Sequence, residues 1–88
     1  MNVIQYRGKV WDMVYRDRIE IDAKICSGKP VIRGTRILVT SILSQLAAGE
    51  SFESIRSGFP GLSDLDIRAA IEFAKESIEA TELAALRD

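Results

Sequence analysis

The sequence has no histidine and a single cysteine, Cys26. Without histidine, one chain can form neither a Cys/His zinc site nor a hydrolase that uses a histidine base. A single cysteine excludes an intrachain disulfide, and a free cysteine most often behaves as a small buried hydrophobe. We therefore expect no metal site, no cofactor and no catalytic residue, and we interpret the protein as a non-enzyme.

Long hydrophobic runs are also missing. The longest uncharged stretch, residues 37–49, is too short to span a bilayer and contains four polar residues. The first residues lack the apolar run of a secretory signal, so we predict a cytoplasmic protein with no membrane partner. With 88 residues, 47% of them hydrophobic and 28% charged, the chain is typical of one small globular domain. Its core is modest, which favours a homodimer.

Charge is unevenly distributed along the chain. Residues 1–36 carry eight Lys or Arg against four Asp or Glu, a net charge of +4, whereas residues 37–88 carry four against nine, a net charge of −5. A basic first half and an acidic second half favour head-to-tail self-association or two different partners.

The first 36 residues predict strands and turns. The stretches "NVIQY" and "KVWDMVY" are rich in β-branched and aromatic residues, and Arg7-Gly8 between them predicts a hairpin. In "RIEID", Ile19 and Ile21 alternate with charged residues, which predicts one buried strand face. In "PVIRGTRI", Gly34-Thr35 predicts a two-residue type II′ turn that places Ile32 opposite Ile37 and Arg33 opposite Arg36.

From Leu38 the apolar spacing becomes helical. The stretch "ILVTSILSQLAAG" has no charge, so we expect a central helix that ends at Gly49. Ser51 predicts the start of a short helix, and Ser63 with Asp66 forms a capping-box-like pair at the start of a longer one. We expect that last helix to bury the stripe Ile67, Ile71, Ala74 and Ile78 and to carry its glutamates on a solvated face. The predicted class is mainly α, a three-helix core of the helix-turn-helix type preceded by β-hairpin strands.

The stretch "SGKPVIRGTRI" combines glycine and lysine as a phosphate-binding loop does. Pro30 follows Lys29 where such a loop needs a hydroxyl side chain, so nucleotide hydrolysis by that mechanism is excluded. A weaker hypothesis stays open. Two facing arginines, Arg33 and Arg36, repel each other, and a phosphate or an acidic partner would relieve that repulsion. The alternative is a pair of solvated arginines on an edge hairpin.

Residues 19–75 resemble the bacterial family called domain of unknown function 433. The resemblance rests on a Gly-Lys-Pro…Ile-x-Gly-Thr-Arg-Ile run and on later helix and connector positions. The matching residues are Gly28, Lys29, Pro30, Ile32, Gly34, Thr35, Arg36, Ile37, Leu46, Gly49, Pro60, Leu62, Ser63, Ile67 and Ala70. It implies a homeodomain-like helical domain after a β-hairpin, and an antitoxin that is encoded beside a PIN-like nuclease toxin. The family has no agreed catalytic residues.

Three segments follow: an N-terminal strand extension (1–18), the family domain (19–76) and a C-terminal helical tail (77–88). The first hypothesis is an antitoxin of a type II toxin–antitoxin pair, bound to a PIN-like RNase through a basic hairpin and the tail. The second is a DNA-binding regulator, although Asp64 and Asp66 at the start of the last helix oppose phosphate binding there. A structural dimer is a third. The candidate contacts to a partner or nucleic acid are Lys29, Arg33, Arg36 and Arg68, and those of the tail are Ile78, Leu83 and Leu86.

Overall fold

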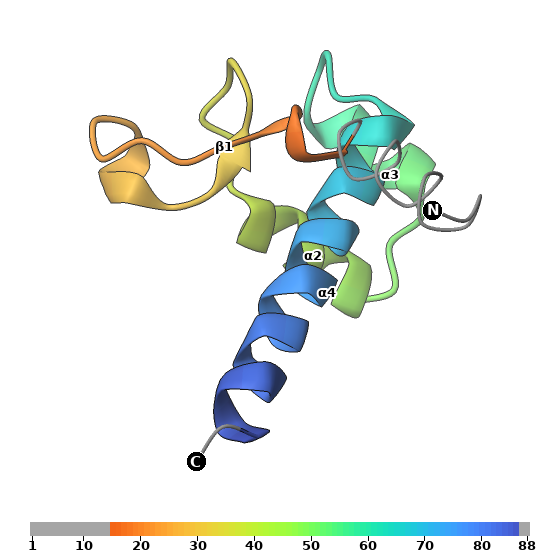
Figure 1. The fold of residues 1–88 in the computed structure, drawn as a ribbon. Coiled ribbons are helices and arrows are strands. Elements are labelled where there is room, and N and C mark those ends of the chain that lie inside the picture. Colours follow the sequence, from red (N-terminus) through yellow and green to blue (C-terminus); the bar gives the residue numbers. More distant parts are fainter. Residues whose placement is uncertain (1–14, 87–88) are drawn as a thin grey trace, which may run out of the picture.

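The computed structural model describes residues 15–86 as a group of three α-helices with two short strands beside it (Figure 1). The elements in chain order are β1 (Ile19–Glu20), the 3₁₀ turn η1 (Cys26–Gly28), β2 (Val31–Ile32), α2 (Val39–Ala47), α3 (Phe52–Gly58) and α4 (Asp64–Leu86). The mainly helical class with preceding antiparallel strands is therefore confirmed. The hairpin expected in the first 14 residues lies outside the described residues. Tyr15 and Arg16 are helical, so the strand expected over 9–15 does not reach Tyr15.

The two strands are antiparallel, with Ile19 opposite Ile32. The chain then turns back, and the Ile32 N–H donates to the Ile37 carbonyl at 3.0 Å, which confirms the predicted pairing of Ile32 with Ile37. One expectation for β1 is wrong. Ile19 is buried, but Ile21 is 60% exposed, because β1 ends at Glu20 and the chain leaves the sheet before the next inward position.

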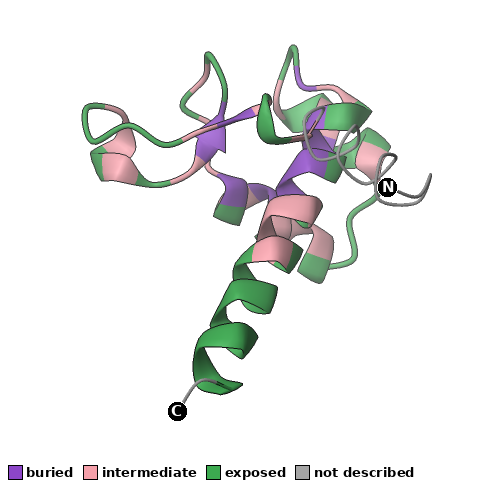
Figure 2. Cartoon of the chain, in the orientation of Figure 1, coloured by how far each residue is buried: buried purple, intermediate pink, exposed green. Residues whose placement is uncertain are grey.

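The core lies where α2, α3 and the first half of α4 meet. Val39 and Ile42 of α2, Ile55 of α3 and Ile67 of α4 are each at most 2% exposed, and the buried residues gather at the top of α4 in Figure 2. The prediction that the uncharged helix α2 is central is thus confirmed.

The buried side of α4 differs from the predicted stripe. Ile67 is fully buried, but Ile71 and Ile78 are 41% and 62% exposed. The helix instead packs through Ala69 and Ala70, which are both fully buried. Helix α4 contacts both α2 and β1, and the small side chains of Ala69 and Ala70 suit a close approach of such elements. Apolar periodicity cannot choose between two overlapping stripes when one of them consists of alanines.

The predicted helix boundaries are confirmed by their hydrogen bonds. The Ser51 hydroxyl accepts from the Ser54 N–H at 3.1 Å at the start of α3, and Gly49 ends the preceding turn with a φ of +89°. At the start of α4, the Ser63 hydroxyl accepts from the Asp66 N–H, and the Asp66 carboxylate accepts from the Ser63 N–H. This reciprocal pair is the predicted capping box. Helix α4 continues unbroken to Leu86 and so includes residues 77–86 of the expected helical tail.

The two isoleucines of α4 provide a test of this packing. We expect Ile67→Ala to lower the free energy of unfolding by about 2–5 kcal/mol, because it leaves a cavity in the core. Ile71→Ala, one turn further along the same helix, should cost less than about 1 kcal/mol because its side chain is partly solvated. Urea unfolding followed by circular dichroism measures both. Equal losses would contradict the observed orientation of α4.

Candidate functional site

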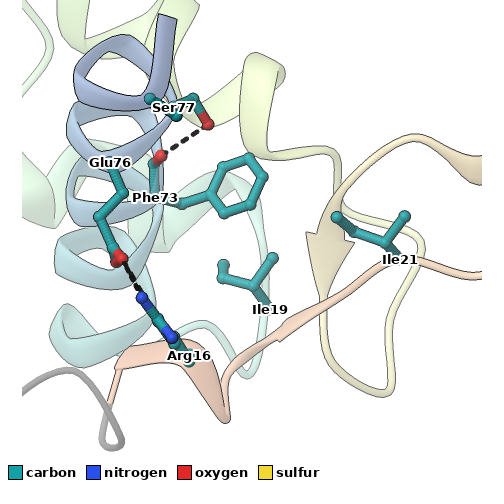
Figure 3. A pocket seen from close by; sticks show the side chains of 7 residues that line it. Arg16, Ile19, Ile21, Phe73, Glu76 and Ser77 are labelled. Carbon is teal, nitrogen blue, oxygen red and sulfur yellow. Dashed lines mark hydrogen bonds and ion pairs between the residues drawn. The ribbon is translucent and has the colours of Figure 1, made fainter. Parts of the chain in front are cut away.

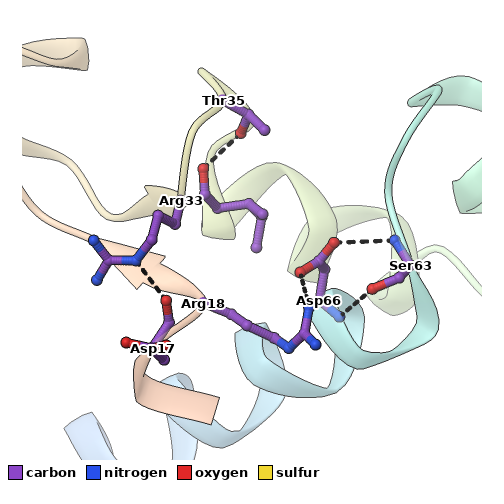
Figure 4. Close-up of polar contacts among 7 residues, drawn as sticks. Asp17, Arg18, Arg33, Thr35, Ser63 and Asp66 are labelled. Carbon is purple, nitrogen blue, oxygen red and sulfur yellow. Dashed lines mark hydrogen bonds and ion pairs between the residues drawn. The ribbon is translucent and has the colours of Figure 1, made fainter. Parts of the chain in front are cut away.

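Arg33 is engaged within the fold and does not face Arg36 as an unpaired charge. Its guanidinium donates to the backbone carbonyls of Asp17 and Ile19, the second at 3.3 Å, and its backbone N–H donates to the Arg18 carbonyl at 2.8 Å (Figure 4). The side chain thus holds the segment before β1 against the hairpin. The like-charged pair inferred from the sequence is corrected: the arginine turns away to carbonyl groups, which relieves the repulsion without an external anion.

The Gly-Thr sequence of the hairpin is explained by backbone geometry. The turn centres on Arg33-Gly34, one residue earlier than predicted, because the Thr35 N–H donates to the Ile32 carbonyl at 3.0 Å. Gly34 has a φ of +78° at the third position of this turn, where a type II turn requires a positive φ. The Thr35 hydroxyl donates to the same Ile32 carbonyl and accepts from the Ile37 N–H. These residues shape the turn, and the hydroxyl uses its one donor within the hairpin.

A buried carboxylate links the strand segment to the start of α4. Asp66 is 9% exposed, and its second oxygen accepts from the Arg18 guanidinium at 3.1 Å (Figure 4). Sequence reasoning assigned Asp66 to helix capping and did not identify Arg18. The two residues are 48 positions apart, and only the approach of β1 to α4 brings them together.

Two of the four predicted binding cations, Lys29 and Arg36, lie on adjacent loops and point outward. The Cys26 thiol donates weakly to the Arg36 carbonyl at 3.9 Å, which holds η1 beside the hairpin. Lys29 and Arg36 are exposed, and within residues 15–86 neither side chain has a hydrogen bond or an ion pair. Lys24, which sequence reasoning passed over, is equally exposed and unpaired over the same range. We call Lys24, Lys29 and Arg36 the basic loop.

Arg68 belongs to another surface. It is exposed on the second turn of α4, and within the described residues no hydrogen bond or ion pair connects it to the basic loop. Nearby, Arg56 of α3 pairs with Asp64 at the first position of α4. On the solvent face of α4, Lys75 donates to Glu72 at 2.8 Å, and this hydrogen bond raises the pKa of the Lys75 ammonium above its usual value. Lys75 is therefore a cation at neutral pH.

The second half of α4 projects away from the core (Figures 1 and 2). Every residue from 77 to 86 is exposed, and Ile78, Leu83 and Leu86 are 62%, 64% and 82% exposed. At 100° per residue these three lie within an arc of roughly 140° on the helix. All three predicted tail contacts are thus accessible, and they occupy one side of the projecting helix.

A groove of about 410 Å³ lies between β1 and α4 (Figure 3). Its lining is mainly apolar, and at one end the Arg16 guanidinium pairs with Glu76 at 2.7 Å. The lining residues are Arg16, Ile19, Ile21, Phe73, Glu76, Ser77 and Ala80. Within residues 15–86, no three His, Cys, Asp or Glu side chains are grouped as a metal site requires. The same range contains no helix long and apolar enough to cross a membrane.

The two hairpin arginines differ in a measurable way. We expect Arg33→Ala to lower the free energy of unfolding by about 1–2 kcal/mol, because it removes charged hydrogen bonds to two carbonyls. Arg36→Ala should change it by less than about 0.5 kcal/mol. Chemical denaturation of the two variants compares them directly. A destabilised Arg36→Ala with an unaffected Arg33→Ala would reverse the assignment.

The chain resembles known proteins over most of its length. It is 35% identical over 60 residues to the uncharacterized protein y4eO of Sinorhizobium fredii, and the match covers 68% of this chain but only 27% of that protein. The fold matches the crystal structure of a DUF433 member protein from Anabaena variabilis with a TM-score of 0.67 at 21% identity, over 96% of this chain and 83% of that one. The model of the family described as "Protein of unknown function (DUF433)" matches residues 19–74. The chain therefore belongs to the DUF433 family.

Proposed function

We propose that the protein is a non-catalytic binding module, the antitoxin of a type II toxin–antitoxin pair, and that its partner is a PIN-like RNase. The observation that carries this proposal is the projecting half of α4, in which the three large apolar side chains Ile78, Leu83 and Leu86 are 62%, 64% and 82% exposed. A helical segment of ten residues is marginal in water unless its apolar side packs on something. A partner that covers Ile78, Leu83 and Leu86 supplies that packing.

The mode of recognition follows from the shape of this element. An amphipathic helix that lays its apolar side into a groove of another protein is a recurring way to bind. Leu83 and Leu86 have the i, i+3 spacing of its anchors, and Ile78 lies five residues before Leu83 on the same side of the helix. The basic loop suits a second contact. The active site of a PIN-like RNase holds acidic side chains and a metal, and Lys29 and Arg36 have no acidic partner of their own within residues 15–86. The projecting half of α4 would supply most of the affinity, and the cations of the basic loop would orient the partner.

Co-expression with the product of the neighbouring gene, which we propose to be a PIN-like RNase, tests the proposal. We expect a complex that survives purification and restores growth, and we expect Leu83→Asp with Leu86→Asp to weaken it at least about 30-fold, because two buried anchors become charged. Thr40→Asp with Ser44→Asp is the matched control, since it adds the same two negative charges at exposed positions of α2. No complex and no rescue by the wild-type chain would refute the proposal.

A DNA-reading role is the second candidate, supported by the order of α2, α3 and α4 and by the exposure of Arg68. The start of α4, which reads bases in such domains, begins with two carboxylates. Asp64 is exposed and pairs with Arg56, and Asp66 is buried against Arg18. Neither arginine is therefore available for phosphates in this arrangement, and the repulsion of DNA by Asp64 persists.

DNA binding by the isolated chain separates the two candidates. We expect dissociation constants no lower than about 10⁻⁶ M at physiological salt, typical of non-specific contact, and these constants should rise as salt is added because the affinity falls. Lys29→Ala with Arg36→Ala should remove that weak affinity, and Arg68→Ala should leave it unchanged. Fluorescence anisotropy with duplex DNA measures both. Sub-micromolar binding of one duplex over others, lost in Arg68→Ala, would instead support a DNA reader.

A further inference from the structure

Helix α4 packs on the core through one side. The groove between β1 and α4 lies on that same side, where the core no longer covers it. Ile19, which lines the groove, belongs to the core, whereas Ile21 at the rim of the groove is 60% exposed. Figure 3 shows Phe73 and Ile19 turned toward the hollow, with Ser77 further along the helix. The Phe73 ring is only partly buried. This surface is apolar, adjoins the core and has no cover within residues 15–86.

The same side of α4 continues beyond the groove with a regular spacing. Phe73, Ser77, Ala80 and Ala84 follow one another at intervals of four, three and four residues, which places them within an arc of roughly 60°. The large side chain stands at the end nearest the core, and the small ones stand toward the tip. When two such helices lie antiparallel, the large side chain of each one therefore faces the small side chains of the other.

We propose that a second copy of this chain occupies the groove, with the two α4 helices antiparallel. Phe73 then packs on Ala84 of the partner subunit, and Ser77 packs on Ala80 of the partner subunit. Alanine and serine at the crossing let two helices approach to about 8 Å. A charge at the edge of this surface would oppose such contact, but Glu76 is already neutralised by Arg16.

The charges around the groove favour this occupant. The loop that carries Lys24 and Lys29 begins directly after Ile21 at the rim of the groove. An antiparallel partner brings the acidic end of its α4 toward that loop. Glu79 and Glu82 at this end are exposed and, within residues 15–86, have no hydrogen bond or ion pair. The opposite net charges of the two halves of the chain thus meet across the dimer.

The dimer leaves the toxin-binding side free. Ile78, Leu83 and Leu86 lie away from the Phe73–Ala84 side when α4 is viewed down its axis. The two surfaces are separate, so a failure of the proposed dimer would not refute the proposed toxin binding, and the reverse also holds. A contact of about three helical turns lies at the small end of specific interfaces, below about 1,200 Å². We therefore expect a concentration-dependent equilibrium between monomer and dimer.

Sedimentation equilibrium of the full chain with two neighbouring variants tests the occupant. Ala84 and Ala85 are both exposed, and neither lines the groove of its own chain. Ala84→Glu should raise the dimer dissociation constant at least about tenfold by placing a charge against Phe73 of the partner subunit, whereas Ala85→Glu should change it less than twofold. Leu83→Asp with Leu86→Asp should leave it unchanged. A wild-type chain that is monomeric at about 1 mM, or Ala84→Glu that dimerises normally, would overturn the proposal and assign the groove to another occupant.

Disulfide trapping tests the direction of the helices in a Cys26→Ser background. In an antiparallel pair centred between Ser77 and Ala80, the two Ala80 positions are offset by about 4.5 Å along the axis and the two Ala84 positions by about 16 Å. A disulfide needs α-carbons within about 7 Å. Ala80→Cys should therefore form a covalent dimer under mild oxidation and Ala84→Cys should not. Efficient trapping of both would indicate a parallel pair, and trapping of neither would exclude this helix contact; either result overturns the proposal.

Discussion

The rest of this small fold depends on the buried carboxylate of Asp66. A buried charge is tolerated only when its oxygens are bonded, and here one oxygen accepts from the Ser63 N–H and the other from the Arg18 guanidinium. The first bond begins α4, and the second ties the segment before β1 to that helix. Removal of either partner leaves a charge in the core, so helix start and strand position are stabilised together.

The position of β1 in turn explains the hairpin and the groove. Because Arg18 holds this segment against α4, Arg33 finds the carbonyls of Asp17 and Ile19 within reach and turns away from Arg36. The same placement sets Ile21 opposite the outer turns of α4 and leaves a hollow between them. Arg36 of the Gly-Thr-Arg stretch is therefore left without a hydrogen bond or ion pair of its side chain within residues 15–86, while the glycine and threonine shape the turn.

Helix α4 packs in the core through its first turns and also carries the surfaces that we propose for binding other molecules. Its first turns are covered by α2 and β1, and its last ten residues are solvated on every side. An uncovered helix of this length has two distinct sides. One continues the core through Phe73, and the other exposes Ile78, Leu83 and Leu86. The first is the side that we propose for a second copy, and the second is the side that we propose for a different protein.

The sequence by itself determined the helices α2, α3 and α4 and the residues at which they begin. The uncharged period of α2, the Ser51 cap and the Ser63–Asp66 box are local signals carried by neighbouring residues, and each was found where predicted. The Gly-Lys-Pro and Gly-Thr-Arg stretch likewise indicated the family to which the chain belongs. Only the tertiary structure decided which side of α4 is buried, that Ile21 is exposed, that Arg33 is engaged and that Arg18 reaches Asp66. Those outcomes depend on contacts between residues 14 to 48 positions apart, and no local spacing encodes which partners meet when the chain closes around its core.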